Sequence, residues 1–190
     1  TIASALPGTI ATLEVRVLER REVDRELPFE LVVGVSLPKG DRQKWLVEKL
    51  TELGVTEMVP LETDRGVAQP TDSALERFER SVIEAAKQCG RNRLMRIAKP
   101  QAWDECVSIE LASDSRRLIA HPEGEWAASI GVARSGAKWI AVGPEGGFTD
   151  AEVAAAKAAG WQSVALGERI LRVETAAVAL AAVVALSARS

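Results

Sequence analysis

Short runs of hydrophobic residues recur along the chain at intervals that suit the strands of a buried sheet. The run FELVVGVSL, residues 29–37, has the length and the nearly continuous apolar character of a strand covered on both faces. An alternating segment, LEVRVLE at residues 13–19, predicts an earlier strand, and a charged linker follows it and ends near Pro28. Further strands are predicted at residues 56–63, 116–122, 137–143 and 161–167.

The segment after the first buried run has the period of an amphipathic helix. Leu46, Leu50 and Leu53 fall on one helical face. Asp41 stands where a capping residue belongs, and Gly54 supplies the stop signal at the other end. We therefore expect a helix that begins after Asp41 and packs through its leucines on the sheet.

A longer helix is predicted over residues 72–90, because apolar residues recur there at helical spacing. This face consists of Leu75, Phe78, Val82, Ala86 and Cys89. The opposite face is mostly charged, and the following GRNRLMR adds Arg91, Arg93 and Arg96 with no acid among them. Charge at helical spacing usually marks a solvated face, so a nucleic-acid surface and an ordinary solvent face both stay open.

Two helices in the C-terminal part have distinct signals. Thr149 and Glu152 form a capping box for the first of them, and Gly160 ends it. The last helix, residues 174–189, is apolar on every side, which predicts that it is buried, with a subunit interface as a natural place. The repeated order of strand, turn and helix indicates an α/β domain with a mainly parallel sheet.

Composition narrows the class of protein. The chain carries 24 Lys and Arg against 27 Asp and Glu, a net charge of −3, which argues against a nucleic-acid binder held by overall charge alone. Cys89 and Cys106 give neither a disulfide framework nor a metal-binding spacing, and we expect no metal. The longest apolar run, Ala176 to Leu186, is shorter than the roughly 20 residues of a membrane span, and no signal peptide is evident. We expect a cytoplasmic protein without a membrane partner, whose natural N-terminus lies upstream because the chain does not begin with Met.

Three segments end strands at what should be one edge of the sheet: IAHPEG, VGPEGGF and LGERILRVET. Ligands of open parallel sheets bind at that edge. The acids Asp150 and Glu152 follow the glycine-rich loop and would repel a phosphate, whereas Glu145 within it accepts hydrogen bonds from hydroxyl or amino groups. A neutral or cationic ligand, such as adenosine with a sulfonium-bearing amino acid, suits this loop.

Each of these features also has a purely structural interpretation. A glycine-rich turn after a strand is most often only a turn, and a lone histidine, His121, is as often structural as functional. Glu174 can pair with Arg169 or Arg172 in a structural salt bridge, and the sequence does not decide between that role and a catalytic one. A hydrolase is poorly supported, because no Gly-x-Ser-x-Gly elbow is present.

Four segments together resemble one family. In order, KGDRQKWLVEKLTELGVTEMVPLETDRGV, IEAAKQCGRNRL, GPEGGFTDAEV and LGERILRVETAAVAL are similar to the RsmE family of ribosomal RNA uridine-N3 methyltransferases, in the SPOUT superfamily, and the match runs from Glu14 to Ser190. The resemblance implies a SPOUT-type α/β domain over residues 28–190, with a parallel sheet flanked by helices and a C-terminal deep trefoil knot. It further implies that residues 1–27 are the remnant of an N-terminal PUA-like β-barrel plus linker. A homodimer through the knot region and the C-terminal helix is also implied.

The resemblance also implies site residues. It places S-adenosylmethionine in the knot, largely on backbone groups of His121, Pro122, Gly143, Pro144, Glu145, Gly146, Gly147, Leu166, Gly167, Ile170, Leu171, Arg172 and Thr175. It assigns RNA contacts to Arg65, Lys87, Gln88, Arg91 and Arg93.

The implied reaction is methylation of N3 of a uridine in 16S, small-subunit ribosomal RNA, either free or in the assembled small subunit. Uracil N3 must lose its proton, and a guanidinium stabilises the charge that spreads over the flanking carbonyl oxygens. We expect this of Arg172, with Arg169 as the second choice, while Glu174 orients the arginine or relays the proton. Two alternatives are a catalytically silent RNA-binding dimer and a SPOUT enzyme that methylates another RNA atom.

Overall fold

A computed structural model describes residue 16 and residues 18–20 and 23–187. Most of the strand predicted at residues 13–19, and most of the segment interpreted as a β-barrel remnant, therefore lie outside the described residues.

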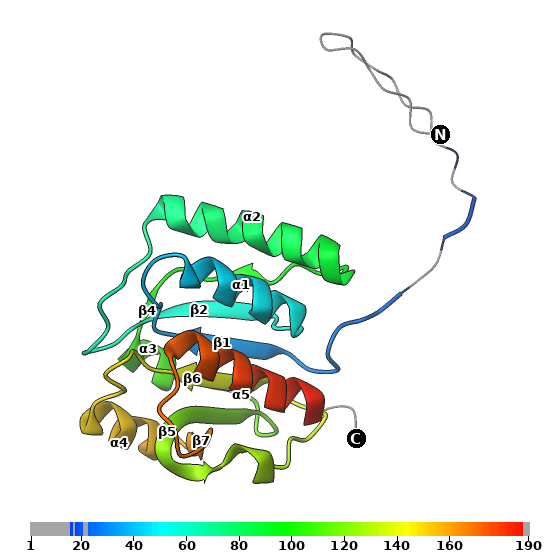
Figure 1. The fold of residues 1–190 in the computed structure, drawn as a ribbon. Helices are drawn as coiled ribbons and strands as arrows, with labels where there is room; N and C mark the ends of the chain where they lie inside the picture. The colour runs from blue at the N-terminus through cyan, green and yellow to red at the C-terminus, as the bar shows by residue number, and fades with distance from the viewer. Residues whose placement is uncertain (1–15, 17, 21–22, 188–190) are drawn as a thin grey trace.

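The described residues form a seven-stranded sheet in the order β3-β2-β1-β6-β5-β7 (Figure 1). The remaining strand, β4, pairs with the end of β2, whereas β3 pairs with its beginning. Every strand pair is parallel, which confirms the predicted α/β class. The strands are β1 (Leu31–Val35), β2 (Glu57–Glu62), β3 (Arg96–Ile97), β4 (Gln101–Ala102), β5 (Arg116–Trp126), β6 (Lys138–Val142) and β7 (Gln162–Ala165).

Helices cover both faces of the sheet and create two cores. The helices are α1 (Arg42–Glu52), α2 (Asp72–Cys89), α3 (Trp103–Val107), α4 (Asp150–Ala158) and α5 (Val173–Ser187), with a 3-10 turn at Ala127–Ser129. Side chains of β1 alternate between the cores: Val33 packs in the cluster formed with α1, α2 and α5, and Val32 packs in the cluster formed with α3 and α4. The sheet is therefore buried on both sides, as its apolar strands require.

The helix ends follow local chemistry in most places. Thr149 and Glu152 make both hydrogen bonds of the predicted capping box, and Gly160 after α4 has a positive φ of 82°. The expected cap of α1 is wrong. Asp41 precedes that helix but makes no side-chain capping hydrogen bond, because its backbone (φ −64°, ψ −16°) is already helical rather than extended.

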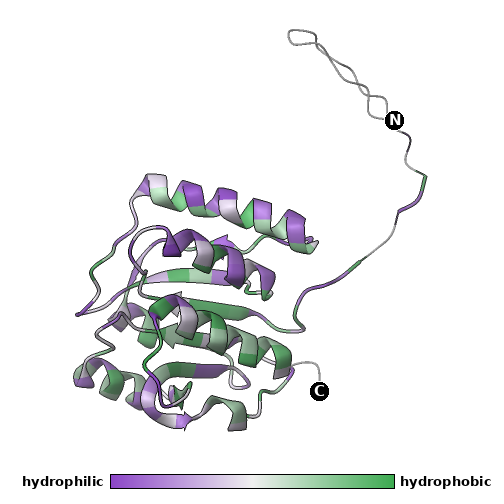
Figure 2. Ribbon diagram, in the orientation of Figure 1, coloured by the Kyte–Doolittle hydropathy of each residue, from purple (hydrophilic) through white to green (hydrophobic). Residues whose placement is uncertain are grey.

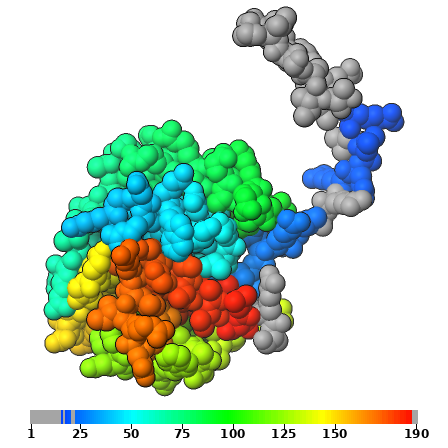
Figure 3. Space-filling view, viewed as in Figure 1, coloured from blue at the N-terminus to red at the C-terminus, as the bar shows by residue number. Residues whose placement is uncertain are grey.

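Helix α5 packs against α1 and against the central strands β1 and β6. Figure 2 shows it among the most hydrophobic elements. Figure 3 shows it at the surface beside α1, and in this view no other element of the described residues covers it. Its outer residues are half-buried or exposed, among them Val178, Val183 and Leu186, so the chain alone buries only part of this apolar helix. No helix in the described part of the chain is long and apolar enough to cross a membrane.

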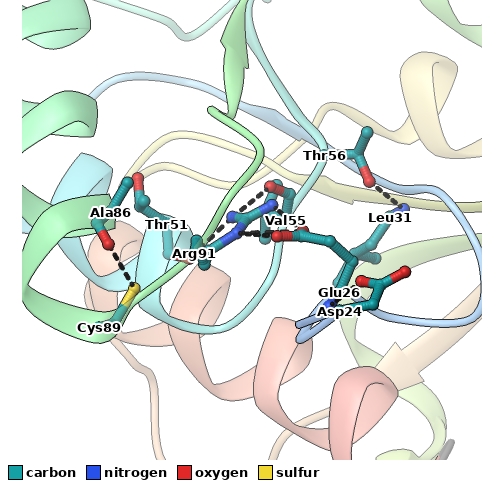
Figure 4. A network of polar contacts seen from close by, with 9 residues as sticks. All are labelled: Asp24, Glu26, Leu31, Thr51, Val55, Thr56, Ala86, Cys89 and Arg91. Atoms are coloured by element: carbon teal, nitrogen blue, oxygen red, sulfur yellow. Dashed lines mark hydrogen bonds and ion pairs between the residues drawn. The ribbon is translucent and has the colours of Figure 1, made fainter. Parts of the chain in front are cut away.

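Arg91 lies in a buried polar network rather than on the surface (Figure 4). Its side chain is 5% exposed, and its Nη2 donates to Glu26 Oε2 at 2.6 Å. Its Nη1 donates to the carbonyl oxygens of Thr51 at 2.8 Å and Val55 at 2.9 Å, at the end of α1. The expected RNA contact is thus corrected: the guanidinium is fully engaged within the protein. A partner 65 residues away and two carbonyl groups at a helix end satisfy it.

This network attaches the segment before β1 to the ends of α1 and α2. Beside the Arg91 pair, Arg25 donates to the carbonyl oxygen of Gly90 at 3.3 Å, and Asn92 donates to the carbonyl oxygen of Val23. Three residues of the charged segment that was predicted to be a linker, Val23, Arg25 and Glu26, therefore contact the folded domain.

Substitution of Arg91 by Ala should lower the free energy of unfolding by about 3 kcal/mol, because it leaves the Glu26 carboxylate and two carbonyl groups buried without a donor. Urea unfolding followed by tryptophan fluorescence measures this change. The matched control is Arg96→Ala, whose 2.9 Å pair with Glu57 involves an arginine side chain that is 60% exposed, and its cost should stay below about 1 kcal/mol. Equal losses in the two variants would contradict a buried structural role for Arg91.

Candidate functional site

A pocket of about 280 Å³ lies at the carboxyl ends of β5, β6 and β7, beside the first turn of α5. Three loops form it, and they are the three strand-end segments singled out in the sequence. Of the residues expected at a cofactor, all except Arg172 and Thr175 line this pocket. Arg169, which was expected to be catalytic, lines it too. The other lining residues were not named individually as candidates, although most belong to the same three segments: Ala120, Val142, Phe148, Val164, Glu168, Val173 and Ala176.

The glycine-rich loop after β6 is shaped by close packing. A Cβ on Gly143 would lie 2.9 Å from the Phe148 ring, so only glycine fits there, and Gly147 has a φ of 69°. Phe148 packs on Trp103 with ring centroids 4.5 Å apart, which anchors the end of the loop on the α3–α4 core. The loop can therefore present backbone groups to a ligand from a fixed position.

The second wall comes from an irregularity in β5. Ala120 and Glu125 both lie opposite Val164 of β7, so residues 121–124 loop out of the ladder. Gly124 permits this, because a Cβ there would lie 2.3 Å from the backbone nitrogen of Val164. The looped-out residues carry His121 into the pocket wall, where its Nδ1 accepts a 3.3 Å hydrogen bond from the backbone N–H of Glu123.

The third wall is the segment between β7 and α5. Gly167 has a φ of 125°, and Ile170 is 93% exposed although it lines the pocket. Arg169 also lines the pocket, whereas Arg172 is exposed and lies outside the lining. Both candidate arginines are exposed, and they differ in that only Arg169 borders the pocket.

Residues of the segment between β2 and α2 make hydrogen bonds with the glycine-rich loop and with the first turn of α4. The Glu152 carboxylate accepts from the backbone N–H of Thr149 at 2.6 Å and from that of Asp64 at 3.0 Å. Arg65 Nη1 donates to the carbonyl oxygen of Gly146 at 2.7 Å. Arg65, expected at RNA, is thus an exposed residue that contacts the pocket loop itself.

Glu174 pairs with a residue that the sequence did not indicate. Arg42, at the start of α1, places Nη1 3.5 Å from both Glu174 carboxylate oxygens, and its Nη2 is 3.7 Å from Glu145 Oε1. The ion pair of Glu174 is therefore with Arg42, and not with Arg169 or Arg172 as expected. The sequence shows no sign of this contact, since the partners are 132 positions apart.

The other residues expected at RNA lie away from the pocket. Lys87, Gln88 and Arg93 are exposed at and just beyond the end of α2. Their neighbour Arg91 contacts Val55, just before β2 begins, so this group lies at the opposite edge of the sheet from the pocket (Figure 1). The structure therefore divides the expected RNA-facing set of five into Arg65 at the pocket, the buried side chain of Arg91, and three exposed residues at the far edge.

Thiol chemistry has no place in this site. Cys106 is buried in the α3–α4 core, and burial raises the pKa of its thiol to about 12, so the thiol stays protonated at neutral pH. Among the described residues, no group of three or more His, Cys, Asp and Glu side chains is arranged to hold a metal ion.

Comparisons with known proteins give the family. A family model described as an RNA methyltransferase domain matches residues 25–185. Ribosomal RNA small subunit methyltransferase E of Synechocystis sp. is 36% identical over 176 residues, which cover 90% of this chain and 58% of that protein. The protein of the same name from Bacillus subtilis is 33% identical, with 84% of this chain and 67% of the relative covered.

A solved structure has the same fold. Ribosomal RNA small subunit methyltransferase E from Neisseria gonorrhoeae, bound to S-adenosyl methionine, matches with a TM-score of 0.77 and 35% identity over 87% of this chain and 68% of that one. The chain spans 58% of the length of the Synechocystis relative and about two thirds of the other two. Because the family model matches most of the chain and relatives are more than 30% identical to it, the chain belongs to the RNA methyltransferase family that includes ribosomal RNA small subunit methyltransferase E.

Proposed function

We propose that the chain is the catalytic domain of an S-adenosylmethionine-dependent methyltransferase that acts on N3 of a uridine in small-subunit ribosomal RNA. The observation that carries the proposal is the pocket built by three strand-end loops, in a chain 35% identical to a methyltransferase that was solved with S-adenosyl methionine. The name of that relative supports 16S ribosomal RNA, free or in the assembled small subunit, as the substrate.

The pocket residues fit this cofactor. Apolar side chains at Val142, Val164 and Val173 suit the faces of an adenine ring, and the volume of about 280 Å³ lies near the lower end of ligand sites, roughly 300 Å³ upward. Glu145 and Glu168 offer carboxylates to hydroxyl or ammonium donors and give the wall no phosphate-binding character. Backbone groups of the glycine-rich loop are accessible because Gly146 and Gly147 are exposed.

When bound, S-adenosylmethionine supplies a methyl group activated by a positively charged sulfur. The chain must then hold the acceptor nitrogen in line with that group and exclude water. In this proposal the exposed guanidinium of Arg172, just beyond the pocket wall, stabilises the negative charge on the uracil oxygens after N3 has lost its proton. Arg169, which lines the pocket, belongs with the cofactor contacts.

The proposed role of Glu174 changes with its partner. Its side chain is 8% exposed and faces Arg42, so it orients Arg42 rather than Arg172. A proton relay through Glu174 is not part of the proposal, because its carboxylate is buried and paired with Arg42.

The assembly and the finer topology belong to the same proposal. We propose a deep trefoil knot in the C-terminal third. The support is the path of the chain from the edge strand β7, past the pocket that residues 166–171 line, back to α5 on the central strands β1 and β6. The half-exposed outer face of α5 supports a homodimer through this helix and the knot region. A SPOUT domain over residues 28–190, a PUA-like remnant plus linker over residues 1–27 and a cytoplasmic location complete the proposal, the last because ribosomal RNA is the proposed substrate.

Calorimetric titration should give saturable binding of S-adenosylmethionine and none of ATP, because the pocket lacks a phosphate site. Incubation with in-vitro-transcribed 16S ribosomal RNA, or with small subunits reconstituted from it, should then give 3-methyluridine on nucleoside analysis. No binding by the folded protein would favour a silent RNA-binding protein. A ribose-methylated or differently methylated nucleoside would favour another target atom.

Substitution of Arg172 by Ala should lower kcat by about 10²-fold, the usual cost of losing one group that stabilises an oxyanion, and leave the Kd for S-adenosylmethionine within about twofold. The comparison variant is Arg169→Ala, which removes a pocket-lining side chain and should raise that Kd. Single-turnover methylation and calorimetry measure the two quantities. Full turnover by Arg172→Ala with intact cofactor binding would show that Arg172 is not the stabilising group.

A further inference from the structure

One guanidinium at the pocket joins two carboxylates that belong to different walls. Glu145 belongs to the glycine-rich loop and lines the pocket, whereas Glu174 lies in the first turn of α5, behind the wall formed by Val173 and Ala176. Arg42 lies between them, with Nη2 3.7 Å from the first carboxylate and Nη1 3.5 Å from both oxygens of the second. A ligand in the pocket therefore contacts a wall whose position depends on α1.

The two carboxylates differ in what they need from Arg42. The Glu174 side chain is 8% exposed and requires a partner, while that of Glu145 is 44% exposed and has water available. The pair with Glu174 therefore fixes where the arginine lies, and the arginine in turn attracts Glu145. Of the three side chains, Glu174 is the buried partner that fixes Arg42, and Glu145 is the exposed partner that is free to adjust to a ligand.

The distances from Arg42 to the two carboxylates are long enough to shorten when a ligand binds. Distances of 3.5 to 3.7 Å exceed the roughly 2.7–2.9 Å of a strong N–H···O bond between charged groups. The guanidinium has five donors in a rigid fork and is itself 35% exposed. By contrast, the tether from Arg65 Nη1 to the carbonyl oxygen of Gly146 is already 2.7 Å long and engages only the backbone of the loop.

We propose that Arg42 is a positioning residue that holds Glu145 against the cofactor and transmits the position of the glycine-rich loop to the head of α5 through Glu174. This inference rests on the proposed function, since the ligand concerned is S-adenosylmethionine or its product. It adds a residue from the first βα unit to a pocket whose lining residues all come from residues 120–176.

The experiment is a double-mutant cycle on the Kd of S-adenosylhomocysteine, measured by calorimetry without turnover. Arg42→Ala and Glu145→Gln should each raise this Kd about tenfold, and the double variant should be no weaker than either single one. Arg42→Lys should recover part of the affinity, because the ammonium keeps the positive charge but lacks the planar fork of donors of the guanidinium. The matched control is Lys44→Ala, which removes an exposed ion pair with Glu48 on the same helix and should bind as the unaltered protein does.

Thermal unfolding of each variant separates positioning from stability. A merely structural Arg42 would lower the midpoint temperature and leave the Kd of the folded protein unchanged, which would overturn the proposal. Independent, multiplying effects of Arg42→Ala and Glu145→Gln would overturn it as well. If Arg42→Ala does not fold, Arg42→Lys and the exposed Glu145→Gln carry the test, and wild-type Kd values in both would refute it. Failure of the unaltered protein to bind S-adenosylhomocysteine would instead refute the proposed function, and this inference with it.

Discussion

The site depends on β1 being a central strand with a partner on each side. Leu31 to Val35 are buried on both faces, and the strand is held in parallel register by β2 and by β6. Parallel pairing brings the carboxyl ends of all neighbouring strands to one edge, so the loops after β5, β6 and β7 meet there without any further device. The same register brings the loop after β1, and Arg42 with it, to the pocket. The order of the strands in the sheet therefore determines which residues meet at the pocket.

Much of this fold could be predicted from the sequence, wherever an element is long enough to show hydrophobic periodicity or a capping motif. The continuous apolar run of β1, the helical spacing along α2 and the capping box of α4 each predict the element that the structure contains. The elements that were missed are two-residue strands and a five-residue helix between residues 96 and 107. Such short elements have no period of their own, and their conformation is set by pairing with β2 and packing of Trp103 under α4.

The site was predictable to the extent that backbone conformation defines it. Glycines and turn residues after strands mark the three loops, because positive φ and close packing need them. Long charged side chains give no such signal. Arg91 lies on a charged stretch that looks solvated and is nevertheless buried against Glu26, while Arg42 meets a partner from the far end of the chain. Which carboxylate an arginine finds is a property of the tertiary fold and leaves no local pattern.

The position of β1 also affects how the molecule assembles. Val35 lies opposite Val142, so the first strand of the domain acquires its second partner only when most of the chain has been synthesised. Until then a nascent chain that ends after α2 has an open edge on β1, and neither β6 nor α5 is available to cover it. Unpaired apolar edges are the usual sites of aggregation during folding. The order of strands that creates the pocket therefore delays completion of the core until late in translation, and until then it leaves one side of β1 open to pairing with another chain.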